Sequence, residues 1–170
     1  ASFIGCTFKN NYAERTNSTT YGGAIWIRYP GSKAQLTSPI IFKQTKFINN
    51  YVKAQYDAYG GAVYAERSTE FINCLFVKNY VIAGNGANAN DGRSAFGGAI
   101  VSDPAWYNGS SYDAGTMKII NSTFHGNYAD VKTNNGNSWA GTIAYGRYSN
   151  ASTQTYIFNT IVSGSRVLRG

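Results

Sequence analysis

The chain has 170 residues, of which 43% are hydrophobic and only 14% are charged. This balance excludes an intrinsically disordered chain, and the length predicts one domain spanning residues 1–170. The net charge is +7, but the basic residues are scattered singly along the chain, which argues against a nucleic-acid partner. The sequence has no apolar run of the ~20 residues needed to cross a bilayer, so we expect no direct membrane insertion.

A group of motifs recurs along the chain: a strand-like segment around a Phe, an Asn-Tyr step and a Gly-Gly pair. The copies lie at residues 3–25, 44–63, 71–100 and 119–143, and a fifth begins at residue 157. Their central phenylalanines are 29 to 48 residues apart, so the motifs are constant while the lengths between them vary. Short alternating strands repeated in this way predict an all-β solenoid of about five coils, with the variable insertions in loops.

Stacking each copy on the one before it places equivalent residues in columns about 4.8 Å apart. One column is an inward apolar ladder formed by Phe8, Phe47, Phe76 and Phe124. The next is an asparagine ladder formed by Asn11, Asn50, Asn79 and Asn127. We expect these asparagines to adopt the left-handed turn conformation and their amides to bond the copies above and below. Each Gly-Gly pair is predicted to mark a corner where φ is positive or two backbones approach closely.

The motif pair Phe-x-x-Asn and Gly-Gly-Ala-Ile resembles the repeat of the chlamydial polymorphic outer membrane proteins and their secreted relatives. All four Phe and Asn pairs of the ladders match its first half. Residues 22–25, 60–63 and 97–100 match its second half, whereas residues 140–143 read Ala-Gly-Thr-Ile. The resemblance implies a single-stranded right-handed parallel β-helix that is extracellular or at the cell surface, with an adhesive or structural use.

The alternative function is a carbohydrate-active enzyme resembling a polysaccharide lyase, or a glycan-binding module, because parallel β-helices also carry such activities. Its best candidate site joins Glu66, Glu70 and Asp103 with Arg67 or Lys118, and the net positive charge would draw an anionic glycan. Carboxylates that recur at no fixed repeat position are usually exposed turn charges. We therefore predict no catalytic residue and no enzyme.

No cofactor and no metal ion are expected. The glycine-rich stretch 84–92 supplies one carboxylate, Asp91, where tight calcium sites use several, so it is predicted to be a flexible loop. Strand alternation turns His125 outward, with no motif that would supply a triad partner. Cys6 and Cys74 share a column two copies apart, beyond disulfide distance, and are predicted to be free thiols.

Loops supply further candidates for contact. Glycosylation patterns begin at Asn17, Asn108 and Asn150, which we place in loops, and at Asn121, which we place in a less accessible strand. Five aromatic residues expected in loops could form a face for sugar binding or self-association: Trp26, Tyr29, Trp106, Tyr107 and Tyr112. Two aromatic columns are expected to stabilise the stack: Tyr12, Tyr51, Tyr80 and Tyr128, and then Tyr21, Tyr59, Phe96 and Trp139.

The flanks of the repeats bear on partners. A solenoid coil exposes unpaired backbone groups at its edge, and natural solenoids cover these with terminal caps. Residues before 3 and after 157 show no amphipathic helix or Pro-rich plug. We therefore expect either a stretch of a longer solenoid or an assembling subunit whose copies associate head to tail or laterally. A host or environmental glycan or protein is the other expected partner.

Overall fold

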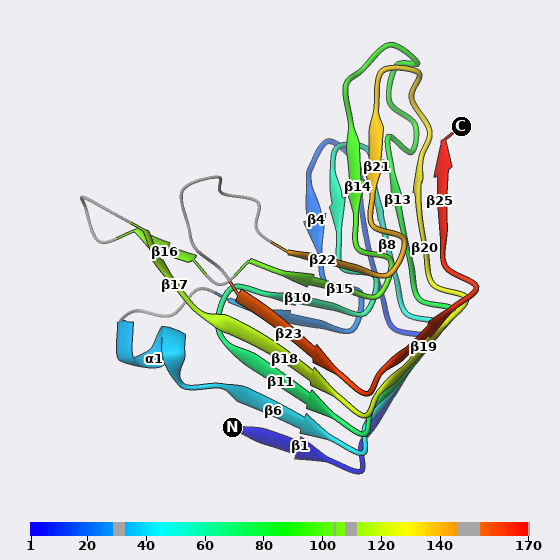
Figure 1. The fold of residues 1–170 in the computed structure, drawn as a ribbon. Helices are drawn as coiled ribbons and strands as arrows, with labels where there is room; N and C mark the ends of the chain where they lie inside the picture. The colour runs from blue at the N-terminus through cyan, green and yellow to red at the C-terminus, as the bar shows by residue number, and fades with distance from the viewer. Residues whose placement is uncertain (29–32, 104, 108–111, 146–153, 170) are drawn as a thin grey trace.

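The chain is a parallel β-helix in which each coil lies on the one before it. The computed structural model describes residues 1–28, 33–103, 105–107, 112–145 and 154–169. Within them the strands form five parallel sheets, three with five strands and two with four (Figure 1). This confirms the predicted all-β solenoid of about five coils. No helix in these ranges is long and apolar enough to cross a membrane.

Three sheets take one strand from each of five coils. The first sheet comprises β1 (Ser2–Ile4), β6 (Ile40–Lys43), β11 (Thr69–Ile72), β18 (Thr116–Ile120) and β23 (Gln154–Phe158). The second sheet comprises β2 (Thr7–Lys9), β7 (Lys46–Ile48), β12 (Leu75–Val77), β19 (Thr123–His125) and β24 (Ile161–Ser163). The third sheet comprises β3 (Tyr12–Arg15), β8 (Tyr51–Ala54), β13 (Tyr80–Ala83), β20 (Tyr128–Val131) and β25 (Arg166–Arg169).

Two sheets take strands from the first four coils. The fourth sheet comprises β4 (Thr20–Tyr21), β9 (Ala58–Tyr59), β14 (Ser94–Phe96) and β21 (Asn137–Trp139). The fifth sheet comprises β5 (Ile25–Ile27), β10 (Val63–Ala65), β15 (Ile100–Ser102) and β22 (Ile143–Tyr145). Two insertions carry structure of their own: the short helix α1 (Lys33–Thr37), and an antiparallel hairpin of β16 (Ala105–Tyr107) and β17 (Tyr112–Ala114).

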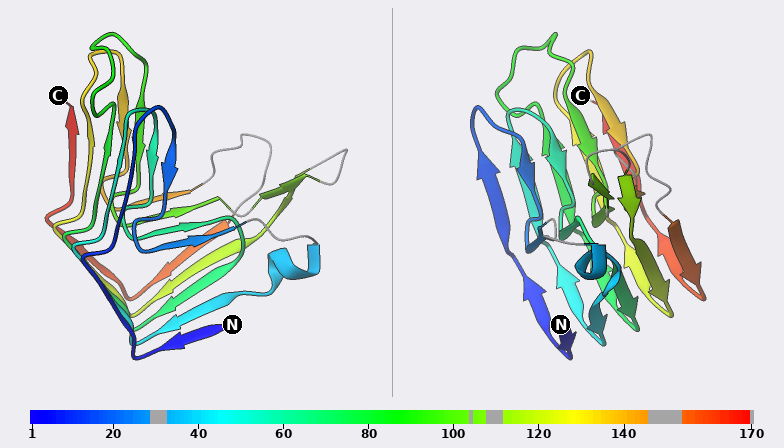
Figure 2. Two further views of the ribbon diagram at one scale, coloured as in Figure 1. Left: turned by 180° about the vertical axis from the view of Figure 1, so that it is seen from behind. Right: turned by 90° about the vertical axis from the view of Figure 1, so that its left-hand side faces the viewer.

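Each coil is bent like the letter L, so the solenoid has two arms (Figures 1 and 2). The lower arm lies between the first, second and fifth sheets, and its core is rich in large side chains such as Phe42, Phe71 and Met117. The upper arm lies between the third and fourth sheets, and its hydrophobic cluster consists, among the described residues, of alanines and valines such as Val52 and Ala54. Small interior side chains let these two sheets lie close together, which explains the thin arm.

The predicted phenylalanine ladder is confirmed and runs up the lower arm. Phe8, Phe47, Phe76 and Phe124 are register partners in the second sheet. Successive ring centroids are 5.1, 4.6 and 4.5 Å apart, with the rings nearly parallel. The last three rings are fully buried, and Val162 continues the column in coil five. The ladder therefore fixes the register of the coils from inside.

The asparagine ladder lies at the neck between the two arms. Asn79 Oδ1 accepts hydrogen bonds from the backbone N–H and the Nδ2 of Asn50, at 3.0 and 2.9 Å. Asn79 Nδ2 in turn donates to Phe47 O and to Asn127 Oδ1, both at 3.0 Å. The same pattern joins Asn11 to Asn50. The side-chain amides of the ladder thus form a continuous chain of hydrogen bonds in the interior.

One expectation for this ladder is wrong: its asparagines do not hold the left-handed conformation. Positive φ falls on the residue before each of them, with values of 58° at Asn10, 54° at Asn49, 54° at Lys78 and 63° at Gly126. The bend therefore precedes the ladder residue and turns its amide inward, where Asn50, Asn79 and Asn127 are fully buried. A corner needs a residue in the left-handed conformation, whereas the ladder needs a buried side-chain amide. The residue before the ladder position meets the first need and the ladder asparagine meets the second.

We expect the Asn79→Ala variant to unfold at lower urea concentration than the wild type. The change removes the acceptor of two Asn50 donors and the donor to Phe47 O, and each buried group left unpaired costs about 1 to 3 kcal/mol. Amide exchange at Asn50 should accelerate in the variant. Asn11→Ala is the matched control, since Asn11 is exposed and water can replace its side chain. Equal losses in the two variants would contradict a buried, energetically important ladder.

The two glycines of each Gly-Gly pair have different tasks. The first has positive φ, 57° at Gly22, 63° at Gly60 and 58° at Gly97. The second lies against the backbone of the neighbouring coil: a Cβ on Gly61 would meet Gly98 O at 2.1 Å. Both parts of the predicted corner are therefore present, but on successive residues. In coil four, Ala140 takes the first position with a φ of 52°, while Gly141 keeps the second.

Candidate functional site

A column of tyrosines runs along the outside of the third sheet. Tyr12, Tyr51, Tyr80 and Tyr128 each follow a ladder asparagine, so strand alternation turns them outward. Their ring centroids are 5.3, 4.9 and 4.8 Å apart and their planes are within 9° of parallel, which confirms the predicted column. Stacking covers the ring faces between neighbours. The inner tyrosines therefore offer edges and hydroxyl groups to solvent rather than ring faces.

Three tyrosines of this column, Tyr51, Tyr80 and Tyr128, line a groove with a volume of about 690 Å³. The left-handed corner residues of the coils form one wall, among them Asn49, Lys78 and Gly126. The opposite wall includes Asp130 and Leu168. Gly126 has no side chain, and its Cα lies beside the Lys78 stem, where a Cβ would meet Lys78 Cγ at 3.6 Å. The Lys78 side chain therefore lies beside the glycine of the next coil at this wall of the groove.

Two phenols of the column, those of Tyr51 and Tyr128, have raised pKa values. Burial raises the pKa of Tyr51 to about 12. The Glu14 carboxylate adds to this rise through a hydrogen bond to the phenol and through its negative charge. Burial also raises the pKa of Tyr128, helped by the neighbouring Tyr80 and the charge of Asp130. A raised pKa keeps a phenol neutral and able to donate a hydrogen bond.

The acidic side chains near the groove are compensated by lysines. Asp130 is bound by Lys132 Nζ at 2.6 Å, and Glu14 by Lys53 Nζ at 3.2 Å. Arg166 occupies the tyrosine position in coil five and lines the groove without an ion-pair partner among the described residues. The free charges on the groove are therefore positive.

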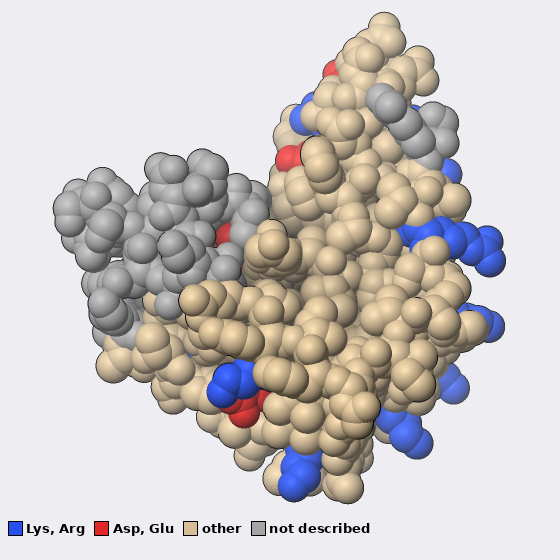
Figure 3. Space-filling model, viewed as in Figure 1, with Lys and Arg blue, Asp and Glu red and all other residues tan. Residues whose placement is uncertain are grey.

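A basic strip continues from the groove over the second sheet. Figure 3 shows Lys and Arg side chains projecting down the right-hand and lower edge of the molecule, with no acidic side chain visible among them. Its exposed cations lie on or next to the second sheet: Lys9, Lys43, Lys46 and Lys78. The sequence did not indicate this strip because the basic residues are far apart in the chain. Stacking brings them onto one side of the solenoid, although each holds a different register position in its coil.

The carboxylates considered for an enzyme have separate partners. Glu70 pairs with Lys118 Nζ at 3.0 Å, and these residues are direct register neighbours in the first sheet. Glu66 Oε2 accepts from Trp26 Nε1 at 3.3 Å. The buried Asp103 accepts from Tyr64 OH at 3.1 Å, and Arg67 Nη2 donates to Ser38 O at 2.8 Å. Each group thus has a structural contact of its own.

The other chemical candidates are also in structural roles. Both cysteines are free thiols, as predicted, and burial raises the pKa of Cys74. His125 is exposed, as predicted, and its Nδ1 lies 3.0 Å from Ser163 Oγ in the next coil, a contact that the sequence motifs did not indicate. In the described ranges, no group of three His, Cys, Asp or Glu residues could hold a metal ion.

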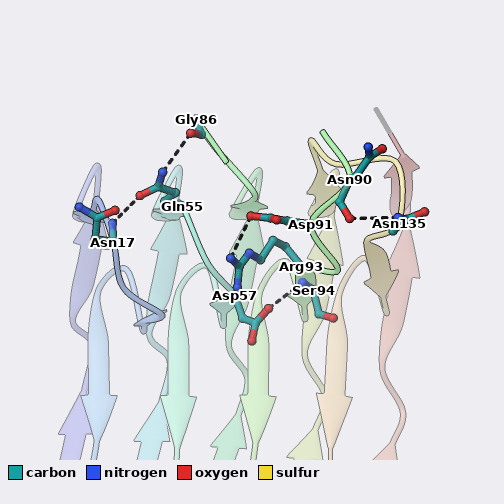
Figure 4. A network of polar contacts seen from close by, with 9 residues as sticks. All are labelled: Asn17, Gln55, Asp57, Gly86, Asn90, Asp91, Arg93, Ser94 and Asn135. Atoms are coloured by element: carbon teal, nitrogen blue, oxygen red, sulfur yellow. Dashed lines mark hydrogen bonds and ion pairs between the residues drawn. The ribbon is translucent and has the colours of Figure 1, made fainter. Parts of the chain in front are cut away.

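The glycine-rich stretch 84–92 lies among hydrogen-bonded turns at the tip of the upper arm (Figure 4). Asp91 binds Arg93 Nη2 at 2.9 Å, and Asp57 Oδ1 accepts from the Ser94 N–H at 2.8 Å. Gln55 links two coils by accepting from the Asn17 N–H at 2.7 Å and donating to Gly86 O at 3.0 Å. Asp91, the single carboxylate of the stretch, therefore forms an ion pair with Arg93.

The predicted glycosylation positions have different outcomes. Asn17 is exposed in a turn, as expected, whereas Asn108 and Asn150 lie outside the described residues. The strand assignment of Asn121 is wrong. This residue is exposed and has a φ of 49° at the corner between the first and second sheets, where Asn159 Nδ2 donates to its Oδ1 at 3.0 Å. The corner needs a residue that tolerates positive φ, and Asn does so.

The predicted contact aromatics are not all in loops. Trp26 lies in β5, 44% exposed, stacked on Tyr21 at 5.1 Å and with Arg28 Cζ 5.1 Å from its ring centroid. The backbones of Trp106, Tyr107 and Tyr112 belong to the β16–β17 hairpin, so these residues are in strands as well. Tyr29 lies outside the described residues. The second aromatic column is confirmed, with centroid distances of 5.2 Å for Tyr21–Tyr59, 4.9 Å for Tyr59–Phe96 and 6.3 Å for Phe96–Trp139.

Comparison with known proteins agrees with the repeat motifs. A family model described as the Chlamydia polymorphic membrane protein repeat matches residues 5–28, which run from the first corner to just past β5. The chain matched none of the curated proteins and none of the solved structures with which it was compared. Proteins with this repeat are surface-exposed outer membrane proteins and are not known as enzymes. Residues 5–28 of the chain therefore match the Chlamydia polymorphic membrane protein repeat, which confirms the resemblance found in its motifs.

Proposed function

We propose that this chain is a non-enzymatic β-solenoid of the cell surface, with an adhesive or structural role, and that it stacks coil to coil on second copies of itself. The observation that carries the proposal is the unbroken register of its columns. Each sheet pairs equivalent residues from one coil to the next. A coil face is therefore a template for another coil of the same kind, supplied by the same chain or by a second copy.

The face of coil five offers an apolar surface to such a neighbour. Ile157, Val162 and Val167 continue the interior columns and are 51%, 50% and 54% exposed. The face of coil one offers Phe3 and Phe8 at the same columns. Stacking one face on the other would bury both sets of side chains, and apolar burial contributes about 25 cal/mol per Å².

The polar columns match in the same arrangement. Arg166 continues the tyrosine column in coil five, and the Tyr12 ring is 64% exposed in coil one. A second copy would place the guanidinium over this ring, a favourable cation–π contact. Within the chain, Oδ1 of Asn50 and Oδ1 of Asn79 each accept a hydrogen bond from the asparagine of the preceding coil. Asn11 Oδ1 would be the equivalent acceptor for coil five of a second copy. This contact joins two different surfaces, so it propagates along one axis instead of closing at a dimer.

Light scattering on the 170-residue chain tests this proposal. We expect the mean mass to rise with concentration in the micromolar range, without a fixed stoichiometry. Arg166→Glu should shift the distribution toward monomer, because the reversed charge meets the electron-rich Tyr12 ring and the nearby Glu14. Lys118→Gln, which changes a cation on the first sheet, should leave association unchanged. A wild-type chain that stays monomeric at tens of micromolar would overturn the stacking proposal.

A further inference from the structure

We infer that the groove along the tyrosine column binds a linear anionic polysaccharide, built of uronic acid or sulfated sugar units, and does not cleave it. The inference rests on the non-enzymatic contact role proposed above and gives it a ligand class. It does not require stacking of copies, because the groove lies on the side of the coils and not on their faces.

The corner regions of the coils carry positive charge only. Residues 2–12, 40–51, 71–80, 119–128 and 157–166 contain no Asp or Glu. They contain five exposed cations: Lys9, Lys43, Lys46, Lys78 and Arg166. Within the described part of the chain, none of these is held in an ion pair. The four lysines hold different register positions across the second sheet and its corners, and Arg166 continues the tyrosine column. They form a positive surface beside and within the groove, which suits a long ligand with several negative charges.

The groove has the size and the polar groups that a sugar chain needs. Its volume of about 690 Å³ falls in the range of ligand sites, and Lys78 and Arg166 both line it. The floor consists of Tyr51, Tyr80 and Tyr128, whose ring edges carry positive partial charge, and the hydroxyls of Tyr80 and Tyr128 can donate to sugar oxygens. The groove thus combines cations for the acidic groups with donors for the hydroxyl groups of a glycan.

The aromatic side chains of the groove favour a glycan over an anionic membrane surface. Binding to a membrane interface favours aromatic or aliphatic side chains that protrude beside the cations. Here the aromatic rings form the floor of a groove, and Ile48, Leu75 and Val77 on the second sheet are half-buried between neighbouring strands. A recessed row of phenols can reach a narrow sugar chain but not a flat bilayer.

The test measures binding of a fluorescent heparin hexasaccharide to the 170-residue chain by anisotropy, at protein concentrations where light scattering shows monomer. The key variant is Lys78→Asn. Asparagine already occupies the same corner column at Asn10 and Asn49, so the fold should tolerate it. Lys118→Gln is the charge-matched control on the first sheet. Tyr80→Phe removes one phenol hydroxyl and keeps the ring stack.

We expect wild-type binding that weakens with salt, a loss of about tenfold in Lys78→Asn, and less than about twofold in Lys118→Gln. Tyr80→Phe should weaken binding by about threefold, as expected for one neutral hydrogen bond. Neutral maltohexaose should not compete. Equal losses of affinity in Lys78→Asn and Lys118→Gln would overturn the proposal that the ligand binds in the groove, because they would show that affinity depends on net charge alone.

Two further readouts separate other outcomes. Phosphatidylglycerol vesicles that bind as tightly as the hexasaccharide, with no effect of Tyr80→Phe, would replace the glycan by a membrane and overturn the inference. Shortened or unsaturated products after prolonged incubation would overturn the non-enzymatic role instead, even if binding occurs in the groove. Absence of binding by the wild type would overturn the ligand class while leaving the stacking of copies untouched.

Discussion

Gly61→Ala is expected to be the most disruptive single substitution in this fold. Gly61 lies at the neck between the arms, where a Cβ would meet Gly98 O at 2.1 Å and the Tyr80 backbone N and O at 2.6 Å. All of these atoms belong to the backbone, so no side chain can rotate away. Overpacking usually costs about 1 to 3 kcal/mol, and we expect a loss above that range because two coils must separate. Urea unfolding measures the difference.

Gly60→Ala is the matched control for this prediction. Gly60 has positive φ, and a Cβ there would meet Val63 O within the same turn. Ala140 occupies the equivalent place in coil four with a φ of 52°, so the turn can adjust to an alanine. We therefore expect Gly60→Ala to cost only about 1 kcal/mol, the strain of one left-handed residue. A control as damaging as Gly61→Ala would show that the turn, and not the contact between coils, requires glycine.

The same pair of glycines shows what the sequence could predict. The change from Gly-Gly to Ala140-Gly141 looks like decay of the motif, yet it preserves the position at which a Cβ cannot fit. The motifs predicted the columns correctly because stacked copies must repeat their inward residues, as Phe47 and Asn50 do. Both a close approach of two backbones and a left-handed turn favour glycine. The sequence therefore could not show which cause applies to which glycine, and the structure does.

The L-shaped coil and the binding groove could not be predicted in this way. Val52 and Ala54 alternate like any strand, and nothing in their spacing shows that they face a second, thinner core. The β16–β17 hairpin lies in an insertion that occurs once, so no repeat marks it. For the groove, a signal was present. The absence of acidic residues from every corner region can be read from the sequence, but a missing residue type is conspicuous only when the copies are aligned.

Phe76→Ala should lower the free energy of unfolding by about 3 to 5 kcal/mol, the usual cost of removing a buried phenylalanine side chain. Phe76 is fully buried, with its ring 4.6 Å from that of Phe47 and 4.5 Å from that of Phe124. The cavity would therefore open between two coils and weaken both interfaces. Urea denaturation with an unchanged slope would report this loss.

Phe8→Ala separates the effect of position in the stack from the effect of residue type. Phe8 is only half-buried and has one column neighbour, Phe47, at 5.1 Å. Because stability in a solenoid is a sum of coil and interface contributions, an outer coil should lose clearly less than an inner one. Similar losses in Phe8→Ala and Phe76→Ala would mean that the solenoid unfolds as one undivided core. A larger loss at Phe76 would show that the stacked rings at the centre hold the coils, and with them the tyrosine groove, in register.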